Sequence, residues 1–156
     1  SSNSIGFGGM FTSCSFTTHP PINTSKGQYF QDMYRFCNLL ESVQVDTAQG
    51  ENFNGMFFSC SSLLTVSLTT AKKDFATNSF QNCIGLTNLT IGEGWGVSIY
   101  LTSCTALTQE SLHGMIENLA DLTGKTAKTF QVGATNLAKI DEEHIAMLQA
   151  KNWNYS

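Results

Sequence analysis

Residues 53–68 read FNGMFFSCSSLLTVSL, and the apolar pattern of this stretch recurs along the chain and decides the fold. Successive cysteines lie 23, 23, 23 and 21 residues apart, at Cys14, Cys37, Cys60, Cys83 and Cys104. Apolar residues recur 7, 4 and 3 positions before these cysteines and 3, 6 and 8 positions after them, with some exceptions. The shared unit is therefore F-x-x-M-F-x-x-C-x-x-L-x-x-V-x-L.

One such unit cannot bury its own apolar face, whereas stacked units share a continuous core. The V-x-L end alternates with polar residues as a half-buried strand does. The F-x-x-M-F-x-x-C half has the spacing of a short helical or 3₁₀ segment. The pattern predicts an α/β solenoid of the leucine-rich-repeat type. Its right-handed coil has a parallel sheet on the concave side and short helical or 3₁₀ turns on the convex side.

Both ends of the chain depart from this unit. Pro20 and Pro21 fall at the strand of the first repeat, where proline cannot donate to a ladder, so we expect an edge or no strand. After Cys104 the pattern predicts helices over 109–121 and 142–151, begun by Thr108 and Asp141, and strands over 129–132 and 152–155. We expect one domain over 1–156, with thin repeats over about 7–106 and two longer helical repeats capping about 107–156. The chain begins at Ser1 without an initiator methionine or signal pattern, so we expect an excised domain or a processed product.

The cysteines are expected to be buried, reduced thiols that act as small apolar fillers. Side chains in the same slot of adjacent turns point the same way, which does not give the short Cβ separation of a disulfide. A zinc site of cysteines is not expected, because no CxxC or CxxH spacing occurs.

Composition argues against several classes of protein. The formal net charge is −4, and eight Lys and Arg residues make no basic stripe, so no nucleic-acid partner is expected. No apolar run approaches the roughly 20 residues that span a bilayer, so no membrane insertion is expected. The abundance of Ser, Thr and Asn beside few Lys and Arg is more typical of secreted or virion surfaces than of cytosolic enzymes.

The sequence offers no catalytic, cofactor or metal motif. His19, His113 and His144 share no ligand spacing, and structural or surface roles are favoured for them. Neither a G-x-S-x-G elbow nor a G-x-G-x-x-G loop is present, and the acidic run 141–143 is explained by helix capping. We therefore predict a protein that is not an enzyme and binds no cofactor.

A polar wall between the buried strand positions is the candidate ligand-binding surface. It could bind a sugar or peptide, or could be an inert solvated face. Trp95, in a glycine-flanked loop, is a candidate stacking anchor, with folding over the core as the slightly favoured alternative. The candidate residues are Ser42, Gln44, Asp46, Thr65, Ser67, Asn88, Thr90 and Trp95.

The repeat, as in residues 56–63, resembles the BspA-like leucine-rich repeats of bacterial surface proteins. Residues 107–140, LTQESLHGMIENLADLTGKTAKTFQVGATNLAKI, resemble the closing segment of leucine-rich-repeat proteins from phages and prophages of gut bacteria, often described as tail or surface proteins. The resemblance implies an adhesin or a host-recognition part, and it carries no catalytic motif.

The first functional hypothesis is a non-enzymatic adhesion module in a bacterial surface or phage tail protein. It would lie outside the cell or on the virion tail and recognise a glycan or protein of the host surface. In a phage fibre, a homotrimer would raise the avidity of weak sites. The alternative is a structural spacer or assembly domain with no ligand of its own.

Overall fold

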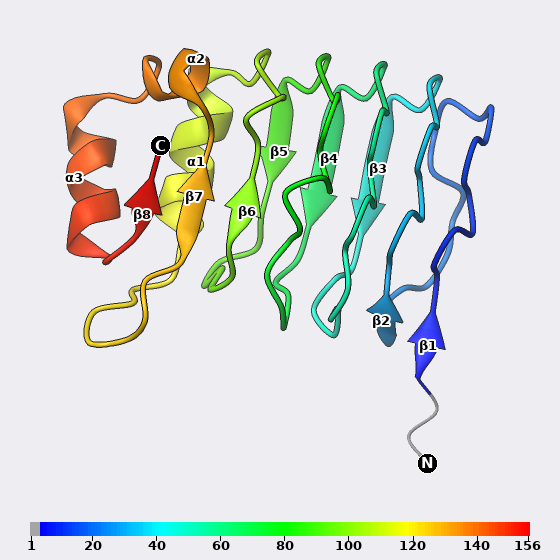
Figure 1. The fold of residues 1–156 in the computed structure, drawn as a ribbon, viewed down its shortest axis with the longest axis horizontal. Helices are drawn as coiled ribbons and strands as arrows, with labels where there is room; N and C mark the ends of the chain where they lie inside the picture. Colours follow the sequence, from blue (N-terminus) through cyan, green and yellow to red (C-terminus); the bar gives the residue numbers. More distant parts are fainter. Residues whose placement is uncertain (1–3) are drawn as a thin grey trace.

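The computed structural model describes residues 4–156, so residues 1–3 of the expected domain lie outside the described part. Its units lie side by side along the long axis of the molecule (Figure 1). The elements follow in the order β1 (Ile5–Gly6), β2 (Gly27–Tyr29), β3 (Ser42–Val45), β4 (Thr65–Leu68), β5 (Asn88–Thr90), β6 (Ile99–Tyr100), α1 (Gln109–Asn118), β7 (Thr129–Gln131), α2 (Ala134–Leu137), α3 (Glu142–Ala150) and β8 (Asn154–Tyr155).

The prediction of a leucine-rich-repeat solenoid with a parallel sheet along its concave side is wrong. Within residues 4–156 the strands form three separate parallel sheets, β1-β2, β3-β4-β5 and β6-β7-β8. Each sheet is two or three strands wide, and none is closed or curled. In Figure 1, β3–β5 run in one direction, and β6, β7 and β8 run in the opposite direction beside them.

The sheet β3-β4-β5 has three strands because neither of the chain segments beside it can form a further strand. On the β3 side, Pro20 and Pro21 lack N–H groups, and only an isolated bridge joins Thr18 to Ser42. On the β5 side the chain forms helix α1 instead of a further strand. The side chain of Ser111 in this helix makes hydrogen bonds to the backbone of β5 in place of a neighbouring strand. Its Oγ accepts from the N–H of Leu89 at 2.9 Å and donates to the carbonyl of the same residue at 3.2 Å.

The segments before the cysteines are successive turns, and the expected helical or 3₁₀ conformation is wrong. The residue before each of the first four cysteines has a positive φ, which interrupts a helix; these are Ser13, Phe36, Ser59 and Asn82. Alternate N–H groups also donate to the next unit, such as Tyr34 to the carbonyl of Met56 at 2.8 Å. Some of the N–H groups that a continuous helix would use within a unit are therefore bonded to the next unit.

The 23-residue spacing of the sequence sets the pairing register. Ser42 pairs with Thr65, and Thr65 pairs with Asn88. Aromatic rings stack in two rows, with one ring per unit in each row and neighbouring centroids 4.0 to 5.6 Å apart. The two rows are Phe7, Phe30, Phe53 and Phe75, and Phe11, Tyr34, Phe57 and Phe80. The core is therefore continuous across the units although the sheets are not.

All five cysteines are free thiols, and all but the half-buried Cys14 are fully buried. Four of them do more than fill space, because the Sγ atoms of Cys37, Cys60, Cys83 and Cys104 donate to the preceding unit. Cys60 reaches the carbonyl of Tyr34 at 3.0 Å, and Cys83 reaches that of Phe57 at 3.0 Å. The predicted burial is confirmed for these four cysteines, and the hydrogen bonds were not foreseen.

The C-terminal segment has the helix starts that the sequence predicts. The Thr108 side chain accepts from the N–H of Ser111, and Asp141 accepts from the N–H of His144, so both N-caps are confirmed. α1 ends at Asn118 rather than at residue 121, and the one-turn helix α2 was not predicted. α1 and α3 pack against each other at this end of the molecule.

Candidate functional site

A polar trough runs across the outer face of β3, β4 and β5. In each strand, buried apolar residues alternate with polar residues that face outward. The outward residues line an open hollow of about 540 Å³, together with His19, Pro21 and Ile22 from the loop before β2. We call the surface formed by these outward side chains the polar trough; its residues are Ser42, Gln44, Thr65, Ser67, Asn88 and Thr90.

Two further hollows continue the polar trough at its ends. One, of about 310 Å³, shares Gln44 and Ser67 with it and contains Asp46. The other, of about 650 Å³, shares Asn88 and Thr90 and is walled by α1. Neighbouring strands lie about 4.8 Å apart, so the three strands together span roughly 10 Å. Because two of the hollows extend beyond the strands, the three hollows form an elongated surface that is wider than this span.

The six residues of the polar trough are uncharged, and His19 is the one ionisable side chain among the described residues that line the central hollow. Burial lowers the pKa of His19, which favours its neutral form at pH 7. Carboxylates lie only toward the ends, where Asp46 accepts from the Thr69 hydroxyl at 2.8 Å and Glu117 stands on α1. Hydroxyl and amide groups therefore dominate the centre of the surface.

The structure brings seven of the eight predicted site residues to this face and excludes the eighth. Trp95 is fully buried, and its ring lies 5.6 Å from that of Phe75, where it continues the first aromatic row. Its Nε1 donates to the carbonyl of Val97 at 2.7 Å. The candidate stacking anchor is wrong, because no ligand can reach this ring, and the slightly favoured alternative, that Trp95 folds over the core, is confirmed.

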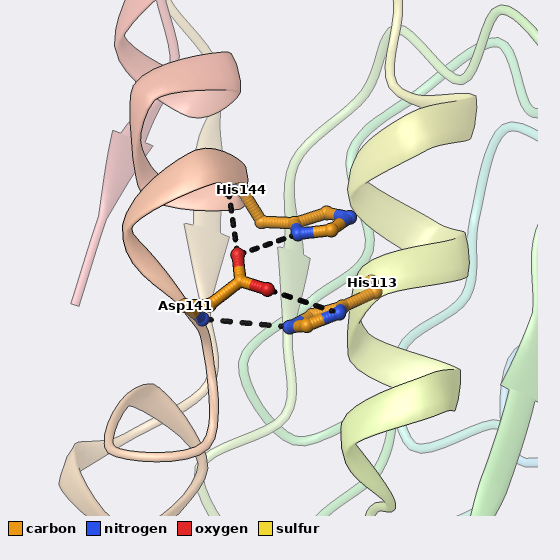
Figure 2. Close-up of side chains that lie close together, drawn as sticks. All are labelled: His113, Asp141 and His144. Atoms are coloured by element: carbon orange, nitrogen blue, oxygen red, sulfur yellow. Dashed lines mark hydrogen bonds and ion pairs between the residues drawn. The ribbon is translucent and has the colours of Figure 1, made fainter.

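A second cluster lies where α1 and α3 meet (Figure 2). The rings of His113 and His144 stack with centroids 3.7 Å apart and planes inclined by 13°. Asp141 lies beside both rings, with 2.7 Å from its Oδ1 to His144 Nδ1 and 3.8 Å from its Oδ2 to His113 Nδ1. On the other side of the imidazole, His144 Nε2 lies 3.3 Å from Glu117 Oε1.

The electrostatics of this cluster favour positive charge on His144. Burial lowers its pKa, but the hydrogen bonds and charges of Asp141 and Glu117 outweigh burial, so the net pKa is raised. The pKa of Asp141 is lowered, chiefly because its carboxylate accepts from the backbone N–H and the ring of His144.

The sequence shows no ligand spacing between His113 and His144, but the structure brings their rings together. They are 31 residues apart in sequence, and only the packing of α3 on α1 unites them. One local signal was available, because Asp141 and His144 have the i, i+3 spacing that places two side chains together at a helix start.

The thiols are poor candidates for catalysis. Burial raises the pKa of Cys37 to about 11 and raises that of Cys60 further above the usual range. Because the thiolate is the nucleophile, such thiols react slowly at neutral pH.

Comparison with known proteins finds no match to a family model, a curated protein or a solved structure. Among residues 4–156, no helix combines the length and apolarity that crossing a bilayer requires.

Proposed function

We propose that the chain is a non-enzymatic binding module whose polar trough holds a neutral, extended glycan of a cell surface. The single observation that carries the proposal is the trough itself, an elongated hollow lined by hydroxyl and amide groups from three strands in register. Side chains such as Gln44 and Asn88 offer both donors and acceptors, which sugar hydroxyls require. The composition of the chain and its resemblance to bacterial surface and phage tail proteins support a site of action outside the cell or on a virion tail.

The rigidity of the trough supports recognition. Its strands are fixed from behind by the stacked core, and their register is uniform from β3 to β5. Preorganised groups lose little entropy on binding, so several hydrogen bonds can add to a useful affinity. A glycan is favoured over a protein partner because the surface has few of the aromatic and Arg anchors that dominate protein interfaces.

A glycan array of neutral and charged cell-surface oligosaccharides tests the proposal. The wild-type chain should retain neutral oligosaccharides, and Gln44→Ala should weaken that binding roughly fivefold or more, since a hydrogen bond contributes about 1 kcal/mol. Gln81→Ala is the matched control, because Gln81 is also exposed but lies in a turn away from the trough. Absence of binding to every oligosaccharide, or equal losses in the two variants, would contradict the proposal.

A spacer or assembly role is the second candidate, and the apolar surface of the first unit favours it. Ile5 and Met10 are exposed, and Phe11 and Phe16 are only partly covered. Self-association through this surface should appear in multi-angle light scattering as a mass that rises with concentration and falls to that of one chain in Met10→Lys. A single-chain mass at all concentrations would reject it.

A further inference from the structure

The histidine cluster gathers three side chains that metals favour. His113 comes from the middle of α1, whereas Asp141 and His144 come from the cap and first turn of α3 (Figure 2). One potential ligand atom from each of these three residues lies within 4.8 Å of the others. The cluster is distinct from the polar trough, although His113 also lines the hollow at the α1 end.

The cluster is held in place before any ion arrives. The His113 and His144 side chains are only 16% and 10% exposed, so the surrounding packing limits their rings to small rotations. The Asp141 carboxylate is fixed by the backbone N–H of His144, from which it accepts at 2.9 Å. A preorganised and partly dehydrated set of donors reduces the cost of binding an ion.

The donor set matches divalent transition metals. Two imidazoles and one carboxylate suit Zn²⁺, Co²⁺ or Ni²⁺, whereas Ca²⁺ and Mg²⁺ prefer oxygen ligands alone. Glu117 supplies the supporting contact that ligating histidines usually have, because it can accept the Nε2 proton of His144. That tautomer leaves the lone pair of His144 Nδ1 directed toward the Asp141 side.

We propose that His113, Asp141 and His144 form a binding site for one divalent transition-metal ion, of which Zn²⁺ is the prime example. The ion would replace the Nδ1–Oδ1 hydrogen bond of His144 and Asp141, and small rotations of the stacked rings would direct their nitrogens toward it. The His113 ring can adjust, because its contact with the N–H of Asp141 is long at 3.5 Å. The bound ion would tie α3 to α1, and water would complete its coordination.

The site can be reached from solvent. Glu117 is 61% exposed, and it lines the hollow at the α1 end together with His113 and Asn118. An ion can therefore enter and leave without unfolding of the segment.

Calorimetric titration of the EDTA-treated and desalted chain with ZnCl₂ tests the site, and CoCl₂ gives a visible absorption band as a second readout. We expect one ion per chain. His113→Asn and His144→Asn should each weaken binding tenfold or more, and Glu117→Gln should weaken it about tenfold through the supporting contact. His19→Asn is the matched control and should leave the affinity unchanged, because His19 lies outside the cluster.

Two results would overturn the proposal. One is no saturable binding of either ion by the wild-type chain. The other is binding that His113→Asn and His144→Asn leave unchanged. Far-UV circular dichroism of the metal-free variants establishes that they are folded, and if His144→Asn is not, His113→Asn and Glu117→Gln decide. Because glycan binding is measured with variants of the polar trough, failure of one proposal leaves the other to be judged separately.

Discussion

At the residue scale, Cys14 and Cys60 occupy equivalent slots but have different surroundings. Cys60 lies between two neighbouring units and donates to Tyr34, whereas Cys14 is only half-buried in the first described unit. A cysteine at this position of the repeat is therefore shielded from solvent only where a repeat unit packs on each side of it.

We predict that a thiol reagent modifies Cys14 rapidly in the native chain and modifies the other four cysteines only after unfolding. Burial keeps the reagent away from these four, and it raises the pKa of Cys37 and Cys60 above the usual range. Mass spectrometry after timed labelling at pH 8 measures the result, with labelling in urea as the control. Equal rates at all five positions in the native chain would refute this prediction.

His144 makes the free energy of unfolding depend on pH. Because its pKa is raised above the ordinary 6.5, its contribution is complete below about pH 6.5 and is lost as the pH rises through the higher folded-state value. We predict that the stability difference between wild type and His144→Asn, measured in urea with EDTA, is larger near pH 6 than near pH 8.5. The groups facing His144 are His113, Asp141 and Glu117.

His19→Asn is the control, and its effect should have the opposite sign. Burial lowers the pKa of His19, so its contribution is lost as the pH falls below about 6.5. A His144→Asn difference that does not change with pH would contradict the assigned interactions of His144.

At the element scale, the register of β3, β4 and β5 and the starts of α1 and α3 could be predicted. They depend on local alternation and on capping residues such as Thr108 and Asp141. The division into three sheets could not be predicted from the repeat. The spacing of apolar residues shows which side chains are buried, but it does not specify which backbone groups form hydrogen bonds with each other. The turns escaped prediction for the same reason, since a spacing of three and four residues fits both a helix and the turns with positive φ at Phe36 and Ser59.

The junction of β5 and α1 gives a prediction at this scale. Ser111→Ala removes the hydroxyl that pairs with both backbone groups of Leu89, which leaves a buried N–H unsatisfied. We expect the free energy of unfolding to fall by about 1–3 kcal/mol, measured by urea denaturation. The exposed Ser61→Ala should change it by less than about 0.5 kcal/mol. Equal effects would show that Ser111 does not support the edge of the sheet.

At the scale of the whole molecule, two rows of stacked aromatic rings connect the repeat units from Phe7 to Trp95 and from Phe11 to Phe80. Phe57 stacks between Tyr34 and Phe80 and is fully buried, whereas Phe11 begins the same row and is only partly covered. The histidine cluster also belongs to this scale. Its members meet only when α3 docks on α1, so no local pattern of the sequence could join His113 to His144.

We predict that Phe57→Ala lowers the free energy of unfolding by about 3–5 kcal/mol, as expected for a large buried side chain. Phe11→Ala should cost less than about half as much, because its ring already contacts solvent. Urea denaturation of the two variants checks the difference. If the two variants lost similar amounts of unfolding free energy, burial of rings between units would not be what stabilises the molecule.

The most direct test of the central claim is to map the binding surface by amide chemical-shift perturbation in the isotope-labelled chain. The titrant is the tightest neutral oligosaccharide found on the array. We expect saturable shifts concentrated on β3, β4 and β5, at Gln44, Ser67 and Thr90 in particular, with little change in the turns before the cysteines. Shifts confined to those turns or to the first unit would contradict the claim.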